Sequence, residues 1–226
     1  MRILFFSLIL ILQIKVLNAV EFQGKFEQGS FILGKTSPNS KIQIDSKKIR
    51  VSKDGFFAFG LDRDRKNDIV ITITKDGETK TLQKKVFKRK YKIQRIDGLP
   101  PKQVTPPPEV YERIKKDNKL IGKARSLDTP YDFFKDKFIY PIDKYIITGV
   151  YGSQRILNGK PRRPHYGIDF HAPEGTPVKA MMDGEVTLAE DDMYFTGGTI
   201  IFDHGHGVST LYMHMKDINV KVGQKI

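Results

Sequence analysis

The stretch Pro164-His165-Tyr166-Gly167-Ile168-Asp169-Phe170 carries an imidazole and a carboxylate four residues apart. Pro164, Gly167 and Pro173 argue against a helix here. In a flat strand the two Cα atoms would lie roughly 13 Å apart, which is too far for both side chains to bind one ion. A bend at Gly167 would bring His165 and Asp169 together, and glycine permits such a bend. The stretch therefore predicts an imidazole–carboxylate pair suited to zinc or, as the alternative, a half-exposed histidine beside an aspartate in a turn.

Further short motifs follow this stretch in a regular order. They are Ala172-Pro173-Glu174-Gly175-Thr176-Pro177-Val178-Lys179-Ala180, Asp183-Gly184-Glu185-Val186, Asp203-His204-Gly205-His206-Gly207 and Ser209-Thr210-Leu211-Tyr212-Met213-His214. In this order and spacing, residues 138–226 resemble the LytM or lysostaphin-type zinc endopeptidases (metallopeptidase family 23), which cut peptide bonds in bacterial peptidoglycan. The resemblance implies a compact β-sheet core with an active-site groove.

The resemblance also implies a set of site residues. The H-x-x-x-D pair of the family supplies two ligands of Zn²⁺, here His165 and Asp169, and the histidine of the Tyr-x-His strand, here His214, is catalytic beside the metal. The family takes its third ligand and a second catalytic histidine from a late H-x-H, and this sequence ends at Ile226 without one. We therefore expect a C-terminally truncated chain that binds zinc poorly and is inactive by itself. The residues that bind substrate are left unassigned.

His204-Gly205-His206 imitates the late H-x-H, but its position argues against a ligand role. It follows the apolar run 199–202 and leads through Gly207 into the next expected strand, so we expect a tight turn. His171, just past Phe170, is expected at the edge of the groove or in a structural position. Neither an H-E-x-x-H helix nor a Gly-x-Ser-x-Gly turn is present, so thermolysin-like and serine-hydrolase chemistry lack their motifs.

Composition narrows the class of protein further. The 226 residues include 39% hydrophobic residues, which is enough for folded cores. There is no cysteine, so disulfides, thiol nucleophiles and cysteine-bound zinc are excluded. The net charge is +13, from 39 Lys and Arg against 26 Asp and Glu, and it is spread along the chain. We interpret the basic residues as solvated surface rather than as a nucleic-acid site, while attraction to an anionic wall stays open.

The first 19 residues are typical of an export signal. Arg2 precedes an apolar run, residues 3–14, that is too short for a comfortable membrane span, and Ala19 is a small residue suited to cleavage. We predict an exported, periplasmic or cell-envelope protein without stable membrane insertion after cleavage. Lys15 and Leu17 depart from the usual pattern and leave an uncleaved anchor as the alternative.

The rest of the chain predicts a mainly β protein in three parts. Residues 20–92 are predicted to form a small all-β module, for which a sandwich is one arrangement. Its expected role is to position the enzyme, to bind the wall or to act as a spacer. Residues 93–130 read as a proline-rich linker followed by an amphipathic helix at 109–125. Residues 131–226 read as an antiparallel β-sheet core of the LytM type, with strands at 145–151, 167–170, 178–180, 184–189, 199–203, 209–213 and 218–222.

The leading functional hypothesis is a zinc endopeptidase that hydrolyses peptide cross-links of peptidoglycan through a metal-activated water. The alternative is a non-catalytic LytM-like module that binds peptidoglycan or activates a partner hydrolase. A third interpretation is a basic envelope scaffold whose N-terminal β module does the binding. The cross-link that is cut, the regulation and the oligomeric state are not decided by the sequence.

Overall fold

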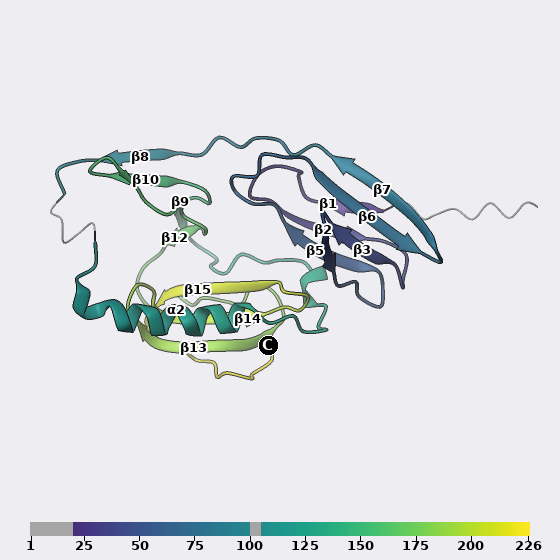
Figure 1. Ribbon diagram of the computed structural model, residues 1–226. Helices are drawn as coiled ribbons and strands as arrows, with labels where there is room; N and C mark the ends of the chain where they lie inside the picture. The colour runs from purple at the N-terminus through teal and green to yellow at the C-terminus, as the bar shows by residue number, and fades with distance from the viewer. Residues whose placement is uncertain (1–19, 100–104) are drawn as a thin grey trace, which may run out of the picture.

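The computed structural model describes residues 20–99 and 105–226. The predicted export signal, residues 1–19, and residues 100–104 of the predicted linker lie outside the described residues. The fold is mainly β, as predicted, with a single α-helix in the part of the chain that the structure describes (Figure 1).

Seven strands form two antiparallel sheets in the N-terminal part, which we call the N-terminal sandwich (residues 20–87). One sheet has the order β1-β2-β5 and the other β4-β3-β6-β7 (Figure 1). The bounds are Glu21–Gln23 (β1), Phe31–Lys35 (β2), Lys41–Ile44 (β3), Lys47–Ile49 (β4), Phe56–Gly60 (β5), Ile69–Lys75 (β6) and Glu78–Lys84 (β7).

The core of the sandwich follows from the alternation of apolar and polar residues in its strands. Ile71 of β6 and Ile42 of β3 come from one sheet, and Ile32 of β2 and Phe57 of β5 from the other, and all four are almost fully buried in one cluster. The β6–β7 hairpin turns at Asp76-Gly77, and both residues have positive φ, as such a turn requires. The residues between 20 and 87 therefore have a core of their own.

The strand β8 (Ile93–Ile96) corrects the prediction that the residues after the sandwich are only a linker. It pairs in parallel with β10 (Gln154–Leu157), which also pairs with the short β11 (Lys160–Pro161). All four residues of β8 are exposed and show no alternating burial pattern, so local sequence carried no strand signal. The backbone pairing with a segment about 60 residues further on, residues 154–157, makes β8 a strand.

The helix α2 (Tyr111–Arg125) follows a short 3-10 turn, η1 (Pro108–Val110), close to the predicted bounds. Its apolar side packs on one face of the sheet β13-β14-β15, where Ala124 joins Leu188, Met193 and Ile201 in one core cluster. The strands are Glu185–Met193 (β13), Gly197–Asp203 (β14) and Ser209–Met215 (β15). The lysines of α2 are exposed to solvent, as predicted, at positions Lys115, Lys116, Lys119 and Lys123.

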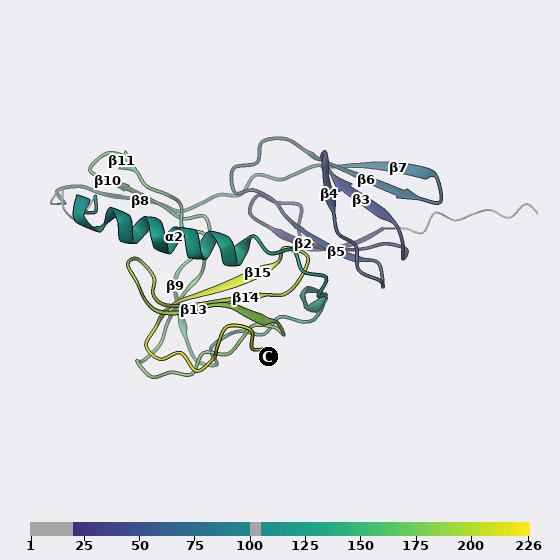
Figure 2. The same cartoon turned by 60° about the horizontal axis from the view of Figure 1, so that its bottom comes forward.

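The opposite face of the β13-β14-β15 sheet is covered by irregular chain (Figure 2). Ala180, Ile218 and Val220 pack there against a second buried cluster, but residues 178–180 and 218–222 are not strands, contrary to the prediction. Their backbone hydrogen bonds go to loops instead: the Lys179 amide donates to the Pro141 carbonyl, for example. The apolar pattern therefore predicted burial correctly and pairing incorrectly.

The part of the chain after residue 131, which we call the C-terminal lobe (residues 131–226), also differs from one antiparallel sheet. It holds the β13-β14-β15 meander, the pair of β9 (Ile146–Gly149) with β12 (Asp169–His171), and the strands β10 and β11, to which β8 from outside the lobe adds a parallel strand. A 3-10 turn, η2 (Phe133–Lys135), precedes these strands. The β9–β12 pair lies between the other two sheets (Figure 1).

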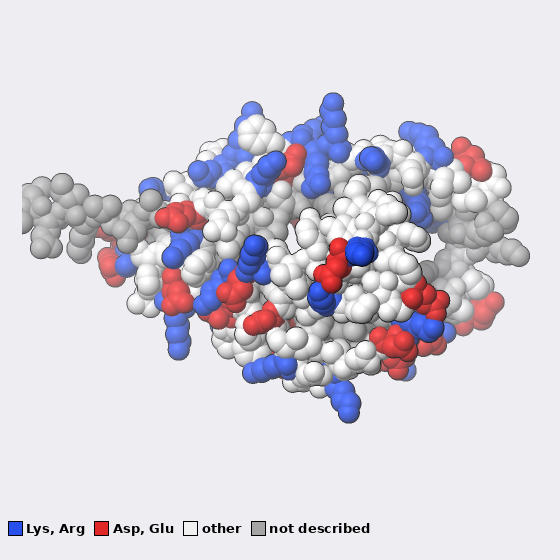
Figure 3. Space-filling model, turned by 180° about the vertical axis from the view of Figure 1, so that it is seen from behind, with Lys and Arg blue, Asp and Glu red and all other residues white. Residues whose placement is uncertain are grey.

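The N-terminal sandwich contacts the C-terminal lobe and the segment just before it through side chains. Arg50 donates to Asp128 at 2.9 Å, and Lys135 lies 3.2 Å from Asp54. These pairs are largely exposed, so each contributes little to stability. Lys and Arg side chains are spread over both parts on the face shown in Figure 3, with Asp and Glu between them. This distribution agrees with a mixed solvated surface.

Among the described residues, no helix is long and apolar enough to cross a bilayer.

Candidate metal site

His165 and Asp169 meet, as the bend at Gly167 predicted. The His165 Nε2 atom lies 3.1 Å from Asp169 Oδ1, and the chain bends at Gly167 between them. The two side chains are 28% and 53% exposed, so they are open to solvent and to a ligand. The two donors that the metal hypothesis names therefore lie on the same side of the chain and within reach of each other.

Asp169 is placed by the pairing of β12 with β9. It begins β12 opposite Gly149, the last residue of β9. A Cβ atom at Gly149 would lie 2.0 Å from Asp169 Oδ2, so the carboxylate occupies the space that a side chain would fill. The register shifts between Asp169 and Phe170, an irregularity of the kind that re-aims side chains beside functional sites.

His165 is held by the loop after β9. Its amide donates to the Ser153 carbonyl at 2.8 Å, and its carbonyl accepts from the Gly152 amide at 2.7 Å. The ring Nδ1 lies 3.3 Å from the Val150 carbonyl oxygen, which can only accept, so this contact requires a proton on Nδ1. With a metal bound, that tautomer would offer Nε2 as the ligand on the side of Asp169; without a metal, the 3.1 Å contact with Asp169 Oδ1 is made by a proton on Nε2. A backbone carbonyl on the distal nitrogen is a common support of metal-binding histidines.

The pair fits a zinc ion in chemistry and in spacing. Zinc is bound by imidazole nitrogen and carboxylate oxygen at about 2.0–2.2 Å, so two ligands of one tetrahedral ion lie about 3.3–3.6 Å apart. The observed 3.1 Å between Nε2 and Oδ1 is close to that separation. In residues 20–99 and 105–226, however, no three His, Asp or Glu side chains are grouped to hold a metal. These residues therefore bring together two donors of a zinc site.

His214 occupies an irregular point of β15. Ile200 pairs with Tyr212 and Gly198 with Met215, so β15 has one residue more than β14 between these pairs. His214 has φ +61°, a conformation that costs a non-glycine residue roughly 1–2 kcal/mol, and its amide donates to the Thr196 carbonyl at 2.8 Å. The imidazole is exposed. The simple strand alternation that put His214 on the face of Tyr212 does not continue through this irregularity.

The turn His204-Gly205-His206 is structural, as its position predicted. His204 is fully buried, and its Nδ1 lies 2.6 Å from the Asp183 carbonyl and its Nε2 2.8 Å from Thr210 Oγ1. Burial lowers the pKa of His204 because the charged ring would lose its hydration, although the Asp183 carbonyl opposes the shift. Both ring nitrogens of His204 are engaged, so it has no nitrogen free for a metal.

His206 and His171 lie in different surroundings. The ring of His206 packs against Phe134 with a centroid distance of 4.7 Å, and burial lowers its pKa. The segment before η2 docks on this turn, because the His206 amide donates to the Thr129 carbonyl. His171 ends β12 and is exposed, in agreement with an edge position.

Three polar residues ahead of His165 have separate roles. Asn158 forms two hydrogen bonds with the backbone of Leu99, at 2.7 and 3.0 Å, and so is committed to the fold. The Arg163 guanidinium lies 5.5 Å from the ring centroid of Tyr166. Arg155 is exposed on β10.

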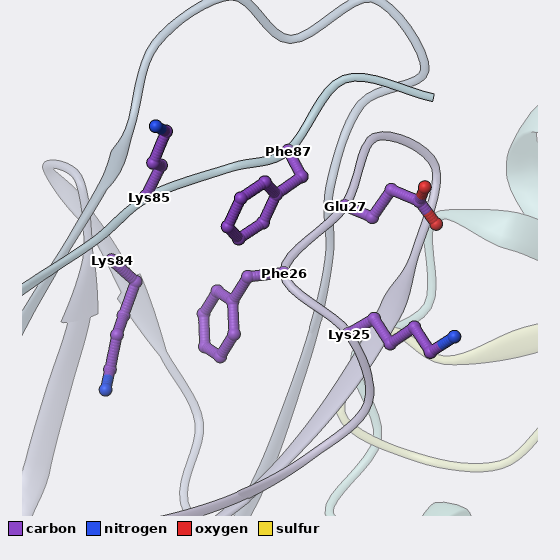
Figure 4. A pocket seen from close by; sticks show the side chains of 6 residues that line it. All are labelled: Lys25, Phe26, Glu27, Lys84, Lys85 and Phe87. Atoms are coloured by element: carbon purple, nitrogen blue, oxygen red, sulfur yellow. The ribbon is translucent and has the colours of Figure 1, made fainter. Parts of the chain in front are cut away.

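The surface of the described residues includes two hollows of similar size. One, of about 520 Å³, is formed between residues 60–64 of the N-terminal sandwich and two tyrosines of the C-terminal lobe, Tyr151 and Tyr166, the second of which adjoins His165. The other, of about 540 Å³, lies on the sandwich alone (Figure 4). Figure 4 shows the rings of Phe26 and Phe87 side by side with lysine side chains around them, and the lining residues are Lys25, Phe26, Glu27, Lys84, Lys85 and Phe87.

The C-terminal lobe, which is mainly β and carries an exposed imidazole–carboxylate pair, is similar in sequence to a known peptidase family. Residues 163–226 match the sequence model of peptidase family M23. The matched segment contains His165, Asp169 and His214.

Several known proteins are similar to parts of the chain. The peptidoglycan DD-endopeptidase ShyA of Vibrio cholerae is 37% identical over 89 residues, which are 38% of this chain and 20% of the relative. The cell division protein DipM of Caulobacter vibrioides is 29% identical over 125 residues, 54% of this chain and 19% of the relative. The glycyl-glycine endopeptidase ALE-1 of Staphylococcus capitis is 41% identical over 63 residues, 27% of this chain and 17% of the relative. The matches thus span at most about a fifth of these relatives.

A solved structure shares the fold over most of the chain. The crystal structure described as a peptidase M23 from Pseudomonas aeruginosa has a TM-score of 0.66 and 22% identity, and the match covers 89% of this chain and 79% of that one. At this identity the similarity establishes the fold alone. It extends beyond the M23 segment, so the N-terminal sandwich takes part in the shared architecture.

Sequence reasoning missed the groups that support the pair. The Val150 carbonyl and the space at Gly149 were not identified, and neither were the sandwich residues that contact Gly152. A glycine at the end of a strand is the one local signal that pointed to a close approach. The partner of that approach, Asp169, is 20 residues away in sequence and is brought there by strand pairing.

Proposed function

We propose that this protein is a zinc-dependent endopeptidase that hydrolyses peptide cross-links of bacterial peptidoglycan. The observation that carries the proposal is the 3.1 Å approach of His165 Nε2 to Asp169 Oδ1 inside the segment that matches peptidase family M23. The names of two relatives, a peptidoglycan DD-endopeptidase and a glycyl-glycine endopeptidase, support peptidoglycan peptides as the substrate class. The export signal predicted at residues 1–19 agrees with work in the periplasm or cell envelope.

In this proposal His165 and Asp169 hold the metal. The Val150 carbonyl keeps the Nδ1 proton of His165 in place, so that Nε2 remains the donor. A zinc ion in such a site supplies a Lewis acid and makes a bound water acidic near neutral pH. His214, on β15 of the same lobe, would take or give a proton at its imidazole as a general acid–base.

The metal affinity of residues 1–226 alone follows from their donor set. A zinc site of a hydrolase uses three protein ligands, whereas the described residues bring together two. We therefore propose that His165 and Asp169 alone hold zinc weakly, and that a third protein ligand is needed to complete the site.

The test is digestion of purified sacculi by the protein purified from its native source. We expect soluble muropeptides with new free amino groups, loss of activity with a chelator, and recovery on adding Zn²⁺. His165→Ala and Asp169→Ala should each abolish metal binding and digestion, whereas His206→Asn should retain both, because His206 lies in a structural turn and asparagine tolerates its positive φ. Chelator-resistant digestion, or zinc binding lost only in His206→Asn, would overturn the proposal.

The second candidate is a non-catalytic module that binds peptidoglycan or activates a partner hydrolase. It predicts that sacculi sediment the protein and that chelation changes nothing. The combination of an exposed His165–Asp169 pair with His214 favours the enzyme, since a pure binding module has no need of two converging metal donors.

A further inference from the structure

The loop that holds His165 is itself held by the N-terminal sandwich. Arg63, which follows β5, donates from Nε to the Gly152 carbonyl at 2.8 Å. Arg63 is only 9% exposed, so this charged hydrogen bond is shielded from water. The same Gly152 donates its amide to the His165 carbonyl at 2.7 Å. One glycine therefore connects a buried guanidinium of the sandwich with the histidine of the candidate metal site.

Arg63 is fixed in place from three sides. Its guanidinium stacks on the ring of Tyr91, with Cζ 4.3 Å from the ring centroid. Its Nη1 lies 2.6 Å from Asp64 Oδ1. The Tyr91 hydroxyl lies 3.1 Å from the Arg63 carbonyl, so the backbone at this point is supported as well. A guanidinium held this way has little freedom to leave Gly152.

Close packing of rings against glycines completes the contact. A Cβ atom on Gly152 would lie 2.0 Å from Tyr91 Cε1, and one on Gly29 would lie 2.4 Å from Tyr151 Cε1. Both glycines have positive φ, so the backbone at these two points is shaped for the approach. Tyr151 and Gly152 of the C-terminal lobe thus fit against the sandwich, and neither contact involves the peptidase segment 163–226 directly.

We propose that Arg63 is a positioning residue for His165, and that the N-terminal sandwich is a structural part of the metal site rather than a spacer. The inference deepens the proposed function. Arg63 binds the carbonyl of Gly152, and this carbonyl belongs to the peptide bond between Gly152 and Ser153. The Ser153 carbonyl accepts from the His165 amide, so the loop meets His165 at its amide, its carbonyl and its Nδ1. Loss of Arg63 frees all three contacts together.

The experiment is amide hydrogen exchange of the full 226-residue chain without metal, comparing Arg63→Met with Arg65→Met. Arg65 is the matched control, because it is also an ion-paired arginine of the sandwich but binds Asp45, at 3.0 and 3.1 Å, within the sandwich. We expect Arg63→Met to lower the protection of the Gly152 and His165 amides at least tenfold while the amide of Ile201 in β14 is unchanged. Arg65→Met should leave the Gly152 and His165 amides as in the unaltered chain.

Two outcomes overturn the inference: unchanged exchange at Gly152 and His165 in Arg63→Met, or an equal loss in both variants. If Arg63→Met does not fold, Arg63→Lys takes its place. Lysine keeps a cation over Tyr91 but lacks the fork that reaches both Gly152 and Asp64, so we expect at least a threefold loss at the same amides. Because neither readout uses metal or activity, zinc binding of the unaltered protein tests the proposed function separately.

Discussion

Gly149 lies opposite Asp169 across the β9–β12 pair, and the carboxylate fills the space where a side chain of residue 149 would stand. A Cβ atom there would lie 2.0 Å from Asp169 Oδ2. A side chain at residue 149 would clash with the end of the Asp169 side chain, which can move. The fold can therefore tolerate the substitution, but the carboxylate would have to leave its position. The absence of a side chain at residue 149 is therefore needed to place the Asp169 carboxylate in the candidate metal site, and is not needed to form the strand.

Gly149→Ala should weaken metal binding without unfolding the protein. The displaced Asp169 would no longer meet His165 Nε2, and loss of such support lowers metal affinity about 10–100-fold. The measurement is competition for zinc against a chromophoric chelator, using the product of the native gene. Gly60→Ala is the control, since a Cβ atom there meets nothing within 4 Å. Equal zinc affinity in both variants would contradict the role of Gly149.

His214→Gly should separate catalysis from stability. The positive φ of His214 is unfavourable for histidine and carries no steric cost for glycine. Glycine, however, loses more conformational entropy on folding. Because the two effects oppose each other, the free energy of unfolding should change by less than about 1 kcal/mol. Removal of a general acid–base lowers the rate about 10²–10⁴-fold. Sacculus digestion and urea denaturation measure the two effects.

Asp76→Gly, at φ +51° in the β6–β7 turn, is the control for relief of backbone strain. It should change stability similarly to His214→Gly and leave digestion intact. Full digestion by His214→Gly would remove His214 from the catalytic assignment.

The stability of the protein should fall below neutral pH because of His204. Burial lowers its pKa in the folded state, whereas the unfolded value is about 6.5. The unfolded state therefore binds more protons below about pH 6.5, and the free energy of unfolding decreases there by at most about 1.4 kcal/mol per pH unit for this group. Above about pH 7.5 the His204 ring is neutral in both states and makes no difference.

Urea denaturation at pH 7.5 and 5.5, with NMR titration of the His204 ring, measures this dependence. We expect a lower midpoint at pH 5.5, and a His204 ring that titrates at a lower pH in the folded protein than in the unfolded chain. A ring that titrates near pH 6.5 in the folded protein would show that His204 is not the cause.

The hollow on the N-terminal sandwich should contribute to wall binding if the sandwich contacts the anionic polymer. Phe87 is 59% exposed there, with exposed Lys25 and Lys85 at the rim. Lys25→Glu combined with Lys85→Glu should reduce co-sedimentation with sacculi several-fold, and the reduction should shrink at high salt because exposed charges are screened. This arrangement of rings and ammonium groups suits an anionic ligand with an apolar part.

The control is Lys47→Glu combined with Lys48→Glu, which makes the same change of charge at two exposed positions of β4. An equal reduction by both double variants would show that net charge, rather than the hollow, governs binding.

The sequence alone predicted the approach of two donors and much of the local structure. The order of His165, Gly167 and Asp169 predicted the bend and the meeting of the two donors, because glycine permits the bend that side chains four residues apart need in order to meet. Alternation in β3 and β6 predicted the sandwich strands, because one face of each is buried. Apolar spacing predicted α2, and its lysines lie in solvent.

Tertiary structure decided everything that depends on partners distant in sequence. β8 is a strand only because residues 154–157 pair with it, and residues 178–180 and 218–222 pack against a sheet without joining it. The left-handed His214 arises from one extra residue between two pairs of β14 and β15. Arg63 reaches Gly152 across 89 positions of sequence, a contact without any local pattern. Local preferences select a strand or a turn, but only the folded chain brings a sandwich arginine to the loop of His165.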